Sequence, residues 1–122
     1  MSQVDTSPVE IALLQGVYAA FNRRDIETVL ASMSEDVDWP NGWEGGRIRG
    51  KAEVRDYWTR LFEALDPKVE PVGFTTESDG RIAVEVHQVV RDRAAGNLLS
   101  DQIIHHVYEI VDGLIRSMEI RA

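Results

Sequence analysis

The stretch LLSDQIIHHVYEIVDGLIRSMEIR, residues 98–121, decides the fold of this chain. β-Branched and aromatic side chains dominate it, and Asp112-Gly113 divides it where a tight turn between two strands would fall. Before it, residues 69–76 and 81–93 have a similar composition, and turns that contain Gly80 and Gly96 separate these segments from the next. The second half of the chain therefore predicts four strands, each antiparallel to the next.

The first residues of the chain predict two helices that run end to end. Ser7-Pro8-Val9-Glu10 has the form of a capping box with Pro at the first helical position, and apolar residues continue at helical spacing to Asn22. Asp25 can cap a second helix. The apolar residues that recur at helical spacing after it are Ile26, Val29, Leu30 and Met33.

A short hairpin and a third helix are expected before the strands. Val37-Asp38-Trp39 favours a strand, and Asn41-Gly42 allows the chain to turn back to residues 47–49. Apolar side chains then keep a helical period from about Lys51 to Leu65, and Asp66-Pro67 ends that helix.

This order of elements predicts an α+β domain in which three N-terminal helices pack on a curved, mainly antiparallel sheet and form a cone with a mouth. Strand alternation gives two strands an inner face, made of Val84, Val86, Gln88 and Val90 in one and of Ile104, His106, Tyr108 and Ile110 in the other. A hairpin centred on Gly96 would place Val86 opposite His106. The same register would place Arg91 opposite Asp101.

Composition narrows the classes of function. The 122 residues include 13 Lys and Arg against 21 Asp and Glu, and the net charge of −8 opposes binding to nucleic acid and to anionic membranes. The chain has no cysteine, and no apolar run approaches the roughly 18 residues that span a bilayer. The length favours one domain over residues 1–122, and a cytoplasmic protein is expected.

A family resemblance rests on three stretches of the sequence, which occur in the order YAAFNRRDIETVLASMSEDVDW, RGKAEVRDYW and HVYEIVDGLI. The chain resembles the SnoaL-like, ketosteroid-isomerase-like branch of the nuclear transport factor 2-like superfamily over nearly its whole length. The resemblance implies a cystatin-like α+β roll that encloses an apolar pocket and forms a homodimer through the outer face of the sheet. Members include isomerases, polyketide cyclases, epoxide hydrolases, dehydratases and proteins without catalysis, so the fold does not decide the chemistry.

Residue by residue, the chain departs from ketosteroid isomerase. The aspartate base that this enzyme carries after its first strand reads as Asn41 here, and an amide cannot take a proton from carbon. The family's tyrosine on the first helix falls nearest Val17, with Tyr18 one residue away. The protonated aspartate of ketosteroid isomerase, which donates a hydrogen bond to a developing enolate, falls on His106 or, with another turn length, on His105. Authentic ketosteroid isomerase activity is therefore not expected.

His106 is the main candidate for chemistry because it is a lone imidazole on an otherwise apolar strand face. If Asp112-Gly113 forms a two-residue turn, His106 pairs with Glu119, which would orient the ring as a general acid or base. If the turn holds three residues, the faces exchange and His106 lies beside Met118 or Ile120. The sequence leaves both registers open.

Other candidates surround a pocket. Asn41 is a possible anchor for a substrate oxygen, although Asn-Gly is first of all a turn dipeptide. The residues expected to line the pocket are Tyr18, Trp39, Trp43, Tyr57, Trp58, Phe62, Val86, Gln88 and Tyr108. No metal or organic cofactor is expected, because His87 and His105 lack the spacing of a zinc site and no Gly-rich phosphate loop is present.

Two functions are consistent with these residues. One is a cofactor-independent isomerase, cyclase, hydratase or hydrolase that acts on a small apolar carbonyl or hydroxyl compound, with His106, Asn41 and Glu119 as candidate catalytic residues. The other is a non-catalytic small-molecule-binding or dimerisation domain in which His106 is structural. The expected partners are a small-molecule ligand and a second copy of the chain.

Overall fold

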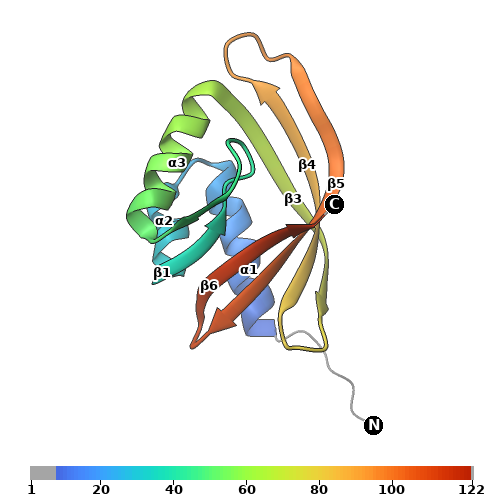
Figure 1. Cartoon of the computed structure of the whole chain (residues 1–122). Helices are drawn as coiled ribbons and strands as arrows, with labels where there is room; N and C mark the ends of the chain where they lie inside the picture. The colour runs from blue at the N-terminus through green and yellow to red at the C-terminus, as the bar shows by residue number, and fades with distance from the viewer. Residues whose placement is uncertain (1–7, 122) are drawn as a thin grey trace.

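Three helices cover one face of a curved, six-stranded mixed sheet in the structure, a computed structural model that describes residues 8–121 (Figure 1). The helices are α1 (Pro8–Asn22), α2 (Ile26–Ala31) and α3 (Lys51–Ala64). The strands are β1 (Met33–Pro40), β2 (Arg47–Arg49), β3 (Leu65–Thr76), β4 (Ile82–Asp92), β5 (Leu98–Val111) and β6 (Leu114–Arg121). This arrangement confirms the predicted α+β class.

The predicted helices are present, with one difference in length. α1 begins at Pro8, whereas Ser7 of the proposed capping box lies outside the described residues. Asp25 caps α2, because its Oδ1 accepts a hydrogen bond from the Thr28 backbone N–H at 3.2 Å. α2 is shorter than its apolar pattern suggested, since Met33 already begins β1. Within residues 8–121, no helix is long and apolar enough to cross a membrane.

β3 is longer than predicted because an edge strand can include the proline that was expected to precede it. The sheet order is β2-β1-β6-β5-β4-β3, in which only β1 and β6 pair in parallel. β3 begins at Leu65, directly after α3, whereas Asp66-Pro67 was expected to lie before the strand. A proline is tolerated in an edge strand because no further strand needs its missing N–H. Pro67 therefore lies within the strand, opposite Val90.

The register of β4 against β5 differs from the predicted register by two residues, so Val84 rather than Val86 lies opposite His106. The Asp92 carboxylate accepts from the Ala95 backbone N–H at 2.6 Å, which forms a tighter turn than one centred on Gly96, and a bulge follows it. A shift of two residues keeps every side chain on its predicted face. His106 therefore faces inward as expected.

The same shift makes the predicted pair of Arg91 and Asp101 wrong. Arg91 lies opposite Leu98. Asp101 instead lies 2.7 Å from His87 Nε2, on the outer face of the sheet.

The β5–β6 hairpin combines the two alternatives that the sequence left open. Asp112 and Gly113 form a two-residue turn, and both have a positive φ (52° and 80°), as a type I′ turn requires. A bulge then shifts the ladder by one residue, so His106 lies opposite Ile120. Of the two registers left open by the sequence, the one that pairs His106 with Glu119 is therefore excluded, and the neighbour of His106 is Ile120, as in the other.

Asn22, at the end of α1, ties the helices to the edge strand. Its Nδ2 donates to the Val69 carbonyl at 2.7 Å, and its Oδ1 accepts from the Val69 backbone N–H at 2.9 Å. The amide side chain thus takes the place of a neighbouring strand at this point of β3. Residues of α1 and β3 consequently face the same interior space.

Candidate functional site

A pocket of about 570 Å³ lies between the helices and the inner face of the sheet. Its walls are mostly apolar, and the aromatic side chains among them are Tyr18, Phe21, Trp39, Trp43, Tyr57, Trp58 and Tyr108. The remaining polar or charged lining residues are Arg47, Gln88, Ser100, Gln102, His106 and Glu119. An apolar cavity with a few polar groups is the usual form of a small-molecule site.

Most of the predicted lining residues border this pocket, and two do not. Phe62 packs against Phe21, with ring centroids 5.1 Å apart, and Val86 is fully buried within the core. Periodicity identifies the buried side of a helix or strand. It does not distinguish a side chain that meets a cavity from one that meets another side chain.

Three buried side chains form a hydrogen-bonded chain at the inner end of the pocket. Tyr108 Oη donates to Tyr18 Oη at 2.8 Å, and Tyr18 Oη lies 2.8 Å from His106 Nδ1. Tyr18 comes from α1, whereas His106 and Tyr108 alternate on β5. The inward strand face and the helix thus bring together residues almost ninety positions apart in the sequence.

The donor and acceptor at each of these two hydrogen bonds determine which nitrogen of His106 carries the proton. Tyr108 is 1% exposed, and no described residue accepts from its hydroxyl except Tyr18. A buried donor without an acceptor is costly, so Tyr108 donates to Tyr18 and Tyr18 donates to Nδ1. Nδ1 is then the acceptor of a neutral ring, and Nε2 carries the hydrogen.

His106 therefore presents an N–H donor rather than a charged acid. No described residue hydrogen-bonds Nε2, and His106 borders the pocket. Burial, helped by His105 nearby, lowers the pKa of His106 to about 4, so the ring is neutral at pH 7. A neutral imidazole N–H can polarise a carbonyl oxygen without giving up its proton.

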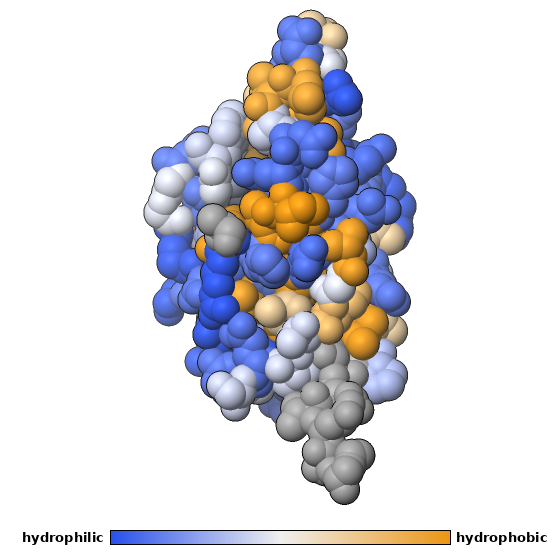
Figure 2. All heavy atoms as spheres, turned by 90° about the vertical axis from the view of Figure 1, so that its right-hand side faces the viewer, coloured by the Kyte–Doolittle hydropathy of each residue, from blue (hydrophilic) through white to orange (hydrophobic). Residues whose placement is uncertain are grey.

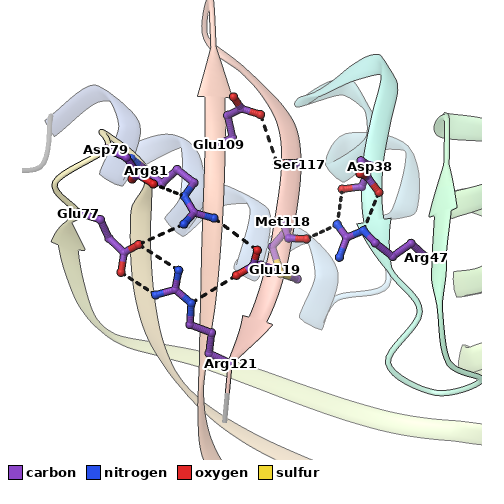
Figure 3. Close-up of polar contacts among 10 residues, drawn as sticks. All are labelled: Asp38, Arg47, Glu77, Asp79, Arg81, Glu109, Ser117, Met118, Glu119 and Arg121. Atoms are coloured by element: carbon purple, nitrogen blue, oxygen red, sulfur yellow. Dashed lines mark hydrogen bonds and ion pairs between the residues drawn. The ribbon is translucent and has the colours of Figure 1, made fainter.

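Glu119 does not contribute a carboxylate to His106. It borders the pocket, but its Oε2 lies 3.5 Å from Arg81 Nη1 and its Oε1 lies 3.4 Å from Arg121 Nε (Figure 3). Glu77 completes this network through two contacts with Arg121, at 2.8 and 3.2 Å. The carboxylate is thereby directed to the face of the sheet that carries Val107, its partner on β5.

Asn41 stabilises a loop rather than lining the pocket. Its Oδ1 accepts from the Glu44 backbone N–H at 2.7 Å, and its Nδ2 donates to the Glu44 carboxylate at 3.0 Å. Glu44 also pairs with Arg60 of α3 at 2.9 Å. The adjacent Trp43 lines the pocket, and its backbone N–H donates to Tyr57 Oη at 3.2 Å. The loop is therefore fixed against α3 at the pocket.

Sequence reasoning missed three polar lining residues. Ser100 and Gln102 continue the alternation that places His106 inward, so the signal was present in the sequence. Arg47 gave no such signal, because its position depends on tertiary contacts. Its Nη2 donates to the Met118 carbonyl at 2.6 Å, and its Nε donates to Asp38 at 2.8 Å (Figure 3).

Residues 8–121 contain no cluster of three or more His, Asp or Glu side chains that could hold a metal ion. The two outer-face histidines do not meet, because His87 pairs with Asp101 and His105 lies opposite Glu85.

The family model of the SnoaL-like domain matches residues 14–118. An NTF2-like protein of unknown function from Burkholderia pseudomallei K96243 is 24% identical, with a TM-score of 0.80 over 94% of this chain and 91% of that one. TerC, co-crystallized with polyporic acid, is 28% identical, with a TM-score of 0.78 over 93% of this chain and 90% of that one.

A proposed polyketide cyclase from Xanthomonas campestris pv. campestris is 24% identical, with a TM-score of 0.73 over 92% of this chain and 88% of that one. Among curated proteins, none matches the chain. At 24% identity, the Burkholderia and Xanthomonas structures show a common fold only.

Proposed function

The chain belongs to the SnoaL-like domain family. We propose that it binds a small, flat, mainly apolar carbonyl compound, with its oxygen at His106. The observation that carries this proposal is the hydrogen-bonded chain from Tyr108 through Tyr18 to His106, which leaves one N–H donor facing an aromatic-walled pocket. Flat rings suit walls such as Trp39 and Trp58. The likeness to TerC, which was co-crystallized with polyporic acid, supports a small-molecule ligand for this pocket.

For a substrate, the same donor would stabilise the negative charge that develops on oxygen as an enolate forms. Glu119 carries the sole carboxylate among the described lining residues, and it is ion-paired with Arg81 and Arg121. The site therefore fits a cofactor-independent isomerisation or cyclisation that starts from an acidic C–H between two carbonyls, whose proton can leave to water.

A non-catalytic binding domain is the second candidate, and the lack of a free carboxylate among the described lining residues favours it. A hydrogen–deuterium exchange experiment distinguishes the two candidate functions. An enzyme would accelerate the exchange of the acidic C–H of 2-acetylcyclohexanone in deuterium oxide, whereas a binding domain would leave the rate at that of the buffer.

The role of His106 is tested with 9-fluorenone and fluorene, which share one ring system and differ in the carbonyl oxygen. His106→Leu should weaken 9-fluorenone binding about three- to tenfold, the range of one neutral hydrogen bond, because the N–H donor is lost. Fluorene binding should stay nearly the same. Calorimetry measures both affinities, and infrared spectroscopy should show a lower carbonyl stretching frequency for 9-fluorenone bound to the wild type.

Tyr108→Phe separates a positioning role from a structural one. This variant keeps His106 but removes the Tyr108 hydroxyl, the donor that makes Tyr18 donate to Nδ1 of His106. Both tautomers of His106 should then appear in ¹⁵N NMR spectra. The shift of the carbonyl stretching frequency of bound 9-fluorenone should become smaller. Equal losses of 9-fluorenone and fluorene affinity in His106→Leu would contradict the proposal, because the ring would then only shape the pocket.

We infer also that two copies pair through the outer face of the sheet. Figure 2 shows apolar side chains gathered on this face between hydrophilic ones, and Ile103 of β5 is 50% exposed. An exposed apolar patch on a sheet is typical of a contact surface.

Sedimentation equilibrium should give a dimer for the wild type and a monomer for Ile103→Lys. Val9→Lys on α1, which is 77% exposed, is the matched control. A monomeric wild type at tens of micromolar would overturn this inference.

A further inference from the structure

Three polar side chains form a second cluster in the pocket, apart from His106. Gln88 of β4 and Gln102 of β5 are direct cross-strand partners, and Ser100 lies two residues before Gln102 on β5, opposite Val90. All three line the same pocket as His106. They are called the amide subsite below.

The side chains of the amide subsite are accessible from the pocket: Gln88 and Ser100 are half-buried, and Gln102 is exposed. No described residue makes a hydrogen bond to the side chain of Gln88, Ser100 or Gln102. By contrast, the amide of Asn22 makes two hydrogen bonds to Val69, and the amide of Asn41 is satisfied by Glu44. Neutral amides and a hydroxyl can both donate and accept, so the subsite suits an uncharged hydroxyl or carbonyl group.

The two polar ends of the pocket are separated by apolar surface. His106 and Gln102 are four residues apart on β5, which corresponds to roughly 13 Å along a strand. Ile104 lies between them on the same face and is buried. The long glutamine side chain shortens the gap between the polar atoms, so a ligand that reaches both ends would be about as long as two or three linked rings.

We propose that the pocket binds an elongated, uncharged ring compound with oxygen at both ends, one oxygen at His106 and the other at the amide subsite. This inference rests on the proposed function, since it uses His106 as the donor at the inner end. It adds a second recognition point, which selects for length and for a distal hydroxyl or carbonyl. Gln88 and Gln102 would be the residues that determine specificity.

Two probes test the amide subsite: 4′-hydroxybiphenyl-4-carbaldehyde and biphenyl-4-carbaldehyde, which differ in the distal hydroxyl. The wild type should bind the hydroxylated probe about three- to tenfold more tightly, the gain expected of one or two hydrogen bonds. The double variant Gln88→Met, Gln102→Met keeps the size of both side chains and removes the amides. It should bind the two probes equally, while its affinity for biphenyl-4-carbaldehyde stays nearly that of the wild type.

Gln15→Met is the matched control, because Gln15 is an exposed glutamine of α1 outside the lining residues. It should retain the preference for the hydroxylated probe. Equal binding of the two probes by the wild type would overturn the amide subsite and leave the proposed function intact. Failure of both probes to bind would instead contradict the proposed function, on which the subsite depends.

Discussion

Acidification from about pH 8 to about pH 4.5 should lower the free energy of unfolding by about 2 to 3 kcal/mol through His106 alone. Burial, with a smaller contribution from His105, lowers the pKa of His106 from 6.5 to about 4 in the folded chain. In the unfolded chain the ring is solvated and takes up its proton at the higher pH. Between these two pKa values the unfolded state therefore binds more protons than the folded state. The stability from neutral His106 is complete above about pH 6.5 and is lost as the pH falls toward 4.

Chemical denaturation of the wild type and of His106→Asn over this pH range measures the effect. Carboxylates common to both proteins titrate in the same range, so the relevant quantity is the difference between the two curves. This difference should shrink or change sign toward low pH, because Asn cannot be protonated there. Parallel curves for the wild type and His106→Asn would show that His106 keeps its ordinary pKa.

The sequence was sufficient to predict the elements and their inner faces, because both depend on local patterns. Asp25, the Asn41-Gly42 turn and the alternation around His106 each encode a feature within a few residues. A strand register depends instead on where a bulge falls. The β4–β5 register was off by two residues, which changes partners but not faces. In the β5–β6 hairpin a single-residue bulge decided between Glu119 and Ile120 as the partner of His106.

The candidate site was less predictable than the fold, because its chemistry depends on contacts between distant elements. His106 was identified from one polar side chain on an apolar face. Its orientation by Tyr18 depends on how α1 crosses β5, and its protonation state depends on burial. No local sequence pattern indicates this orientation or this protonation state. Arg47 likewise acquires its place from Asp38 and the Met118 carbonyl, which belong to other strands.

Trp58→Ala should lower the free energy of unfolding by about 3 to 5 kcal/mol, the range for truncation of a buried aromatic side chain. Trp58 is 3% exposed and lies between α1 and β1. Its ring centroid lies 5.6 Å from that of Phe21 and 5.5 Å from that of Trp39, both in edge-to-face geometry. Truncation loses apolar burial and both ring contacts, and it leaves a void that joins the pocket. Urea denaturation at pH 7 measures the change.

Trp43→Ala distinguishes this core role from a role in the pocket wall alone. Trp43 also lines the pocket but is 41% exposed, so its truncation should cost at most about 1 kcal/mol. Its contact with Tyr57 Oη is made by the backbone N–H, which alanine keeps. Both variants should weaken 9-fluorenone binding, because each removes an aromatic wall, but only Trp58→Ala should destabilise the fold strongly. Equal stability losses in the two variants would mean that Trp58 is not the side chain that joins α1 and α3 to the sheet.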